Sequence, residues 1–108
     1  MKGKRFDKGK SRIDLVPPEA IFALGDALDY GQTKYGERNW EKGMAWGRVF
    51  GSLMRHCWKF WSGEDIDKES GRPHVDLILT NAAFLCTYYH RKIGKDDRAV
   101  LASRKKRQ

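Results

Sequence analysis

Residues 73–91 read PHVDLILTNAAFLCTYYHR, and this stretch decides the fold class of the chain. Its apolar side chains recur at steps of three and four residues, which is the spacing of one face of an α-helix. Pro73 suits the first turn of such a helix, and Ser70 can cap it. The stretch therefore predicts a long amphipathic helix whose apolar stripe consists of Val75, Ile78, Leu79, Ala82, Leu85, Cys86 and Tyr89.

A second apolar face lies beside this stripe and is formed by Leu77, Phe84 and Tyr88. Together the two faces are wider than a three-helix monomer needs. Large apolar side chains left in water would form a sticky patch. We therefore expect the chain to complete its bundle by forming a homodimer or a homotetramer.

Two more helices are expected upstream. Residues 17–30 open on two prolines and place apolar side chains at helical spacing, with Gly31 as the expected end. Residues 46–63 carry another apolar stripe that stops near Gly63. Residues 31–45 contain three glycines and no sustained period, which is typical of an ordered loop. Because strand-like alternation is missing, the sequence predicts an all-α fold, a small bundle of about three to four helices.

Positive charge is concentrated at the two ends of the 108-residue chain. Residues 1–12 carry +5 and residues 91–108 carry +6, so residues 13–90 carry −3 of the formal total of +8. We expect one domain over residues 1–94 and a basic tail over residues 95–108 that catalysis does not need. Basic ends of this kind also suit binding to DNA or RNA.

The sequence contains no apolar run long enough to span a membrane, and its first ten residues, MKGKRFDKGK, lack the apolar core of a secretory signal. We therefore expect a cytoplasmic protein with no membrane partner. Cys57 and Cys86 both lie in apolar helical stretches and are expected to be buried, reduced thiols.

The turn between the second and third helices is rich in carboxylates, with Glu64, Asp65, Asp67 and Glu69 close together. Mg²⁺ and Mn²⁺ take carboxylate ligands and bridge to phosphates. The turn therefore suggests a site for one of these ions. A solvated acidic turn is the more frequent alternative.

Two histidines and an asparagine flank this acidic turn. His56 lies at the border of the apolar stripe on the second helix, and His74 and Asn81 lie on one edge of the third helix. If the two helices are antiparallel, these side chains approach Glu64 and Asp67. Such a set could hold a divalent ion that activates a water molecule. Either histidine alone would more often be a hydrogen-bonded structural residue.

Basic and aromatic side chains upstream of the turn suit a nucleoside triphosphate. Lys and Arg neutralise a polyphosphate, an aromatic ring stacks on a base, and an amide reads the edge of the base. A floppy basic arm and a core tryptophan are the corresponding structural alternatives. The expected substrate-binding residues are Lys10, Arg12, Lys34, Tyr35, Asn39, Trp40 and Arg55.

Four blocks of the sequence, in this order and at this spacing, resemble a known family. They are KGKSRIDLVPPEA (residues 8–20), YGQTKYGERNWEKGM (residues 30–44), RHCWKFWSGEDIDKESGRPH (residues 55–74) and NAAFL (residues 81–85). The combined pattern is similar to the phage-encoded dATP/dGTP diphosphohydrolases, a branch of the all-α nucleoside triphosphate pyrophosphohydrolases related to MazG. Any one block alone would be a weak signal.

The resemblance implies a MazG-like fold in which helices pack into dimers or tetramers, with Mg²⁺ or Mn²⁺ held by acidic residues on two neighbouring helices. It implies hydrolysis of dNTPs to the monophosphate and pyrophosphate. Carried over by position, residues 10–12 would contact phosphate and residues 34–40 would lie by the base. The expected catalytic residues are Glu64, Asp67 and His74, and the expected metal ligands are Glu64, Asp67, His74, Asn81 and His56.

The chain departs from the wider superfamily at one point. Where a second acidic pair would fall, it carries His74 and Leu77. The expected reaction is in-line attack of an activated water on the α-phosphorus, with Lys10 or Arg12 and a second ion stabilising the leaving pyrophosphate. Nucleic acid is not required for it. The alternatives are a non-catalytic helical protein that binds nucleic acid through its basic ends, and an inactive relative that binds dNTP without releasing pyrophosphate.

Overall fold

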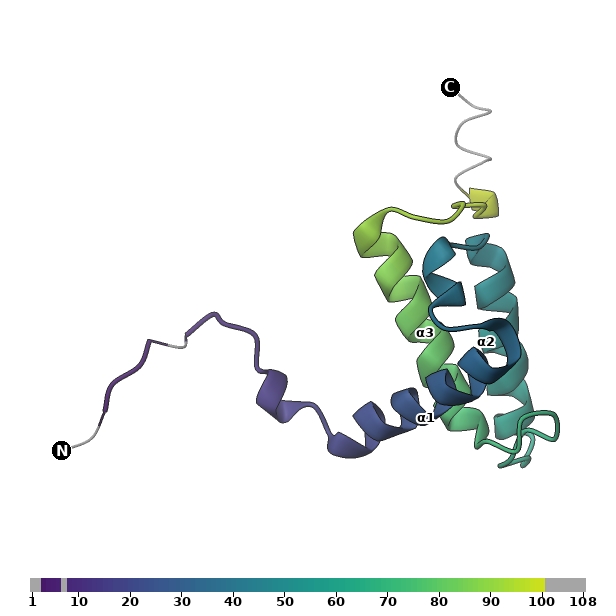
Figure 1. Ribbon diagram of the computed structural model, residues 1–108, viewed down its shortest axis with the longest axis horizontal. Coiled ribbons are helices and arrows are strands. Elements are labelled where there is room, and N and C mark those ends of the chain that lie inside the picture. The colour runs from purple at the N-terminus through teal and green to yellow at the C-terminus, as the bar shows by residue number, and fades with distance from the viewer. Residues whose placement is uncertain (1–2, 7, 101–108) are drawn as a thin grey trace, which may run out of the picture.

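The structure is a computed structural model that describes residues 3–6 and 8–100. The described residues form three α-helices, α1 (Pro18–Tyr35), α2 (Trp46–Trp61) and α3 (His74–Arg91) (Figure 1). A short 3-10 helix, Ile13–Leu15, precedes α1, and a second one, Asn39–Lys42, lies between α1 and α2. The described residues contain isolated bridges but no strand, so the predicted all-α fold is confirmed. None of the described helices combines the length and the apolar character that crossing a bilayer requires.

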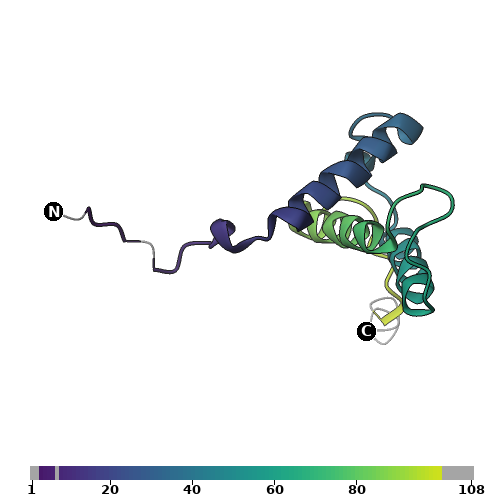
Figure 2. The ribbon, with the colours of Figure 1, turned by 90° about the horizontal axis from the view of Figure 1, so that it is seen from below.

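Helices α2 and α3 pack side by side as an antiparallel hairpin, and α1 packs on α3 (Figures 1 and 2). The described residues before α1 run away from the three helices as an extended arm. The first half of α1 also projects beyond the hairpin, and Phe22 on it is 71% exposed. The packed body of the protein is therefore formed by the hairpin and the second half of α1.

The most buried apolar side chains are Ala27 of α1, Val49 of α2 and Tyr88 of α3. Trp40, which precedes α2 and is half-buried, packs on α3. Its ring stacks on Phe84 with centroids 4.8 Å apart, and the hydroxyl of the fully buried Tyr88 donates to its backbone carbonyl at 2.6 Å. The face of Leu77, Phe84 and Tyr88, which was expected to form the oligomer contact, is thus covered at Phe84 and Tyr88 by the same chain. Periodicity identified this face as apolar, but it could not show that a residue 44 positions upstream of Phe84 covers it.

The bare apolar surface lies elsewhere on the hairpin. Its large side chains are between 45% and 81% exposed, and they are Phe50, Trp58 and Trp61 on α2 and Val75 and Tyr89 on α3. Phe50 and Tyr89 line one hollow of about 990 Å³. The same face leaves Cys86 exposed and Cys57 half-buried, so the expected burial of both thiols is wrong for Cys86, although both are free. Of the described residues after α3, residues 97–100 border the same hollow, and the large apolar side chains above stay exposed.

Two helix ends differ from the sequence-based expectation. Helix α1 continues through Gly31 to Tyr35, because the amide of Gly36 still donates to Gln32 and only Gly36, with a φ of 94°, leaves the helical region. Ser70 does not cap α3, which has no side-chain cap. Its hydroxyl instead donates to Asp67 at 2.6 Å.

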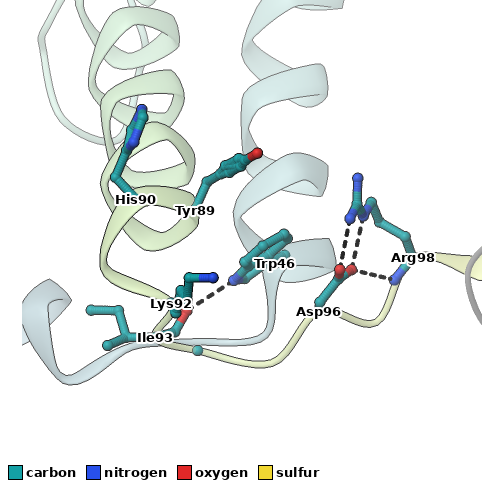
Figure 3. Close-up of a pocket in the computed structure, with 8 residues that line it drawn as sticks. Trp46, Tyr89, His90, Lys92, Ile93, Asp96 and Arg98 are labelled. Atoms are coloured by element: carbon teal, nitrogen blue, oxygen red, sulfur yellow. Dashed lines mark hydrogen bonds and ion pairs between the residues drawn. The ribbon is translucent and has the colours of Figure 1, made fainter.

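The segment after α3 holds the start of α2. The Trp46 indole donates to the carbonyl of Ile93 (Figure 3). The backbone amide of Trp46 donates to the carbonyl of Lys95, and that of Gly47 donates to the Asp97 carboxylate at 2.8 Å. Gly94 has a φ of 79° and lies so close to the Met44 carbonyl that a Cβ would come within 2.4 Å of it. A domain boundary after residue 94 would therefore separate Lys95 and Asp97 from the start of α2, which both residues contact.

Replacing Asp97 by alanine is expected to lower the free energy of unfolding by about 1 kcal/mol, because a carboxylate that caps a helix and faces its positive end is worth roughly that much. For a domain of this size the melting temperature should fall by about 4–8 °C. Thermal unfolding followed by circular dichroism measures the shift. Truncation after Val100 is the control and should leave the melting temperature unchanged; an equal drop in both variants would contradict the capping role.

Candidate metal centre

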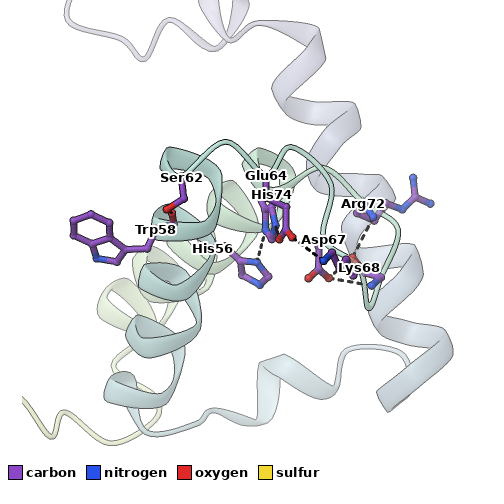
Figure 4. A network of polar contacts seen from close by, with 9 residues as sticks. His56, Trp58, Ser62, Glu64, Asp67, Lys68, Arg72 and His74 are labelled. Carbon is purple, nitrogen blue, oxygen red and sulfur yellow. Dashed lines mark hydrogen bonds and ion pairs between the residues drawn. The ribbon is translucent and has the colours of Figure 1, made fainter.

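Three side chains from three parts of the chain meet at one end of the helical hairpin. His56 comes from α2, Asp67 from the turn, and His74 is the first residue of α3 (Figure 4). One potential ligand atom from each lies within 4.8 Å of the others. Among the described residues this is the one group of three or more His, Cys, Asp or Glu side chains with such spacing.

The turn that carries Asp67 is shaped by its own backbone. The amide of Glu64 donates to Lys59, that of Asp67 donates to Arg72, and that of His74 donates to Asp65, at 3.0, 2.8 and 2.8 Å. These bonds close the turn between α2 and α3. The ligand atoms are therefore held near one another without an ion.

His74 is the central residue of the cluster and is fully buried. Its Nε2 lies 2.7 Å from Oε2 of Glu64, and its Nδ1 lies 2.9 Å from Nδ1 of His56. A carboxylate can only accept, so Nε2 of His74 carries the hydrogen and Nδ1 keeps its lone pair. The hydrogen bond from His74 also lowers the pKa of the Glu64 carboxyl. Glu64 thus aims the free nitrogen of His74 at His56.

Asp67 supplies the buried negative charge, with 7% of its surface exposed. The amide and hydroxyl of Ser70 both donate to its Oδ2, at 3.0 and 2.6 Å, which leaves Oδ1 to face a ligand. Burial by itself would raise the pKa of the Asp67 carboxyl, but the bonds from Ser70 and the nearby histidines outweigh it and lower that pKa. Burial lowers the pKa of His56, against the opposing charge of Asp67, so His56 presents a neutral imidazole.

The donor set fits a divalent ion. It offers two imidazole nitrogens and one carboxylate, which are ordinary ligands for such ions. The two Nδ1 atoms lie 2.9 Å apart, so both rings could contact one ion. A histidine whose other nitrogen donates to a carboxylate is also the usual form of a metal-bound histidine.

Comparison with known proteins identifies the family to which the chain belongs. A family model described as dATP/dGTP diphosphohydrolase, N-terminal, matches residues 1–98. The chain belongs to this family. A protein of Salmonella phage PMBT28, named dATP/dGTP diphosphohydrolase, is 29% identical over 98 residues, which is 91% of this chain and 33% of the relative. The chain thus spans about a third of the length of this curated relative. No solved structure matches it.

Two of the predicted substrate-binding residues of this family member lie near the cluster. The ammonium of Lys34, at the end of α1, pairs with Glu69 in the turn at 2.5 Å, and this contact raises the pKa of Lys34. Arg55 is exposed and directly precedes His56 in α2. Positive charge therefore lies beside the turn at Lys34, whereas the guanidinium of Arg55 lies close to Gly51, one turn earlier on α2.

Other predicted residues are not brought to the cluster. Lys10 and Arg12 lie in the extended arm, where Arg12 pairs with Asp14. Trp40 stacks on Phe84, in agreement with the alternative that it is a packing tryptophan, and Asn39 beside it is half-buried. The place of these four residues in the site stays a prediction.

Tyr35 and Asn81 have different surroundings. Tyr35 is 61% exposed at the end of α1, so its ring is open to a ligand. The Asn81 amide donates to the Leu77 carbonyl one turn earlier on its own helix, at 2.8 Å.

The contact by which Glu64 orients His74 was not predicted from the sequence, because no periodic pattern links a turn residue to a helix that begins ten positions later.

Proposed function

We propose that this protein hydrolyses dATP or dGTP to the monophosphate and pyrophosphate, with Mg²⁺ or Mn²⁺ held by His56, Asp67 and His74. Membership of the dATP/dGTP diphosphohydrolase N-terminal family suggests the substrate class. The buried cluster of two histidines and one aspartate, with Lys34 beside its turn, is the observation that carries the proposal.

The chemistry follows from the charges at the site. A bound divalent ion would lower the pKa of a nearby water and neutralise phosphate oxygens. Lys34 and Arg55 bind the remaining charge of a triphosphate, which carries about four negative charges near neutral pH. The water oxygen bonds to the α-phosphorus, the bond to the bridging oxygen breaks, pyrophosphate leaves, and a proton passes to solvent.

The test is a screen for pyrophosphate release from the common ribo- and deoxyribonucleoside triphosphates, with each of the two ions. We expect release from dATP and dGTP that chelation by EDTA abolishes. Binding of dNTP without release would indicate an inactive relative. Salt-sensitive binding to any DNA or RNA, with no turnover, would favour the nucleic-acid reading instead.

We also propose that a second copy of the chain covers the bare apolar surface of the hairpin. At exposures of 45–81%, its four aromatic side chains and one valine present about 500 Å². A standard interface buries about 800 Å² per partner, of which somewhat more than half is apolar. The exposed area therefore suits a two-fold contact between two copies.

Light scattering at micromolar concentration is expected to give a mass of 25 kDa or more, as a multiple of the 12.5 kDa chain. Replacing Trp58 by glutamate should shift the mass to the monomer, because an unpaired carboxylate cannot be buried in the interface. Arg48→Glu, at an exposed charged position of the same helix, is the control and should keep the oligomer. A monomeric wild-type protein would refute the proposal.

A further inference from the structure

We infer that the cluster is built for a transition-metal ion that accepts imidazole nitrogen, such as Mn²⁺, and discriminates against Mg²⁺, and that Glu64 is a positioning residue rather than a ligand. That the bound ion takes part in catalysis rests on the proposed function. That the cluster binds and selects an ion rests only on its donor atoms and does not depend on a substrate.

The first argument is the chemical type of the potential ligand atoms in the cluster. The cluster presents two nitrogens, from His56 and His74, and one carboxylate oxygen, from Asp67. Mg²⁺ prefers a shell of six oxygens and keeps several waters, whereas imidazole suits first-row transition ions. Mg²⁺ is usually held by one or two carboxylates, waters and substrate phosphates, and two imidazole nitrogens are not the ligands that it prefers.

Glu64 is the nearest further carboxylate, and both of its oxygens already have partners. Its Oε2 lies 2.7 Å from Nε2 of His74, and its Oε1 lies 3.8 Å from the ammonium of Lys68. A carboxylate that holds the far nitrogen of a metal-binding histidine sets the orientation and basicity of the ring. Glu64 thus acts on the ion through His74.

The spacing of the two rings supplies the third argument. Their Nδ1 atoms lie 2.9 Å apart, so one hydrogen lies between them in the absence of an ion. An ion bonded to both nitrogens would replace this hydrogen bond, and the hydrogen would move to Nε2 of His56. His74 is fully buried and Asp67 is 7% exposed, so the packing around them keeps these two ligands close to the ion.

The experiment titrates the metal-free full-length protein with Mn²⁺, Mg²⁺ or Co²⁺ in the absence of nucleotide. The loss of the free Mn²⁺ resonance and the heat of Mg²⁺ binding give the two affinities. We expect Mn²⁺ to bind at least tenfold more tightly than Mg²⁺. Bound Co²⁺ should show a visible spectrum with nitrogen ligands, and His56→Gln should change that spectrum.

Glu64→Gln should weaken Mn²⁺ binding by about 10- to 100-fold without abolishing it, as expected for a residue that supports a ligand. Glu69→Gln is the matched control, because Glu69 lies in the same turn and pairs with Lys34, not with a histidine. It should bind Mn²⁺ as the wild type does. Circular dichroism checks that each variant keeps its helices.

Equal affinity for both ions, or Mn²⁺ binding that is unchanged in His56→Gln, would overturn the inference. If dNTP turnover persisted in that case, the proposed function would stand without it. Selective Mn²⁺ binding by a protein that releases no pyrophosphate would leave the inference standing and refute the proposed function.

Discussion

Asp67→Asn is expected to reduce dNTP turnover by about two orders of magnitude or more while the helical circular dichroism persists. The asparagine oxygen can still accept from Ser70, so the turn keeps its shape. What is lost is the one ionised group that faces both histidines of the cluster. A metal ion contributes several kcal/mol to such reactions, and about 1.4 kcal/mol corresponds to a factor of ten in rate.

Asp65→Asn is the matched control for this variant. It removes the same charge from an exposed position two residues earlier in the same turn, where the backbone and not the side chain bonds to His74. Turnover should stay near the wild-type rate. If Asp67→Asn itself hydrolysed dNTPs at that rate with the same metal requirement, the ion would have to be sought elsewhere.

Glu37 and Glu41 form no second cluster with His56 among the described residues, because Glu41 pairs with Arg38 and Arg91. Glu37 is exposed in the segment after α1. The cluster around His74 is therefore the first place to test.

Trp40→Ala is expected to destabilise the fold by about 3–5 kcal/mol, the usual cost of truncating a packed tryptophan. Its ring stacks on Phe84 and lies beside the ring of the fully buried Tyr88, with centroids 4.8 and 6.4 Å apart, and both contacts are lost in alanine. Single domains have only about 5–15 kcal/mol in total, so the melting temperature should fall by 10 °C or more. Thermal and urea unfolding both measure the effect.

Tyr35→Ala is the comparison that separates packing from substrate binding. Tyr35 is 61% exposed, so its removal should leave the melting temperature unchanged and raise KM if the ring stacks on the base. A stable Trp40→Ala variant with weakened nucleotide binding would assign the stacking role to Trp40 instead. Trp40→Phe should recover part of the lost stability.

The sequence by itself determined the three helices and the acidic turn between the last two. Each depends on neighbours along the chain, because the apolar side chains that mark a helix recur every three or four residues. The stretch over residues 73–91 matches α3 to within one residue at its start. The same local reasoning placed His56, Asp67 and His74 among the candidate ligands, since a hairpin with a short turn brings its facing ends together.

Only the tertiary structure decided what covers each face and which atom meets which. Trp40 covers Phe84 and Tyr88 from more than 40 positions away, while Val75 and Tyr89 of the predicted stripe stay exposed. Glu64 proved to hold His74, leaving the two histidines and Asp67 to face one another. Periodicity reports that a side chain is apolar or polar and on which side of a helix it lies. Its partner is chosen by the packing of whole elements, which depends on contacts between residues distant in the sequence.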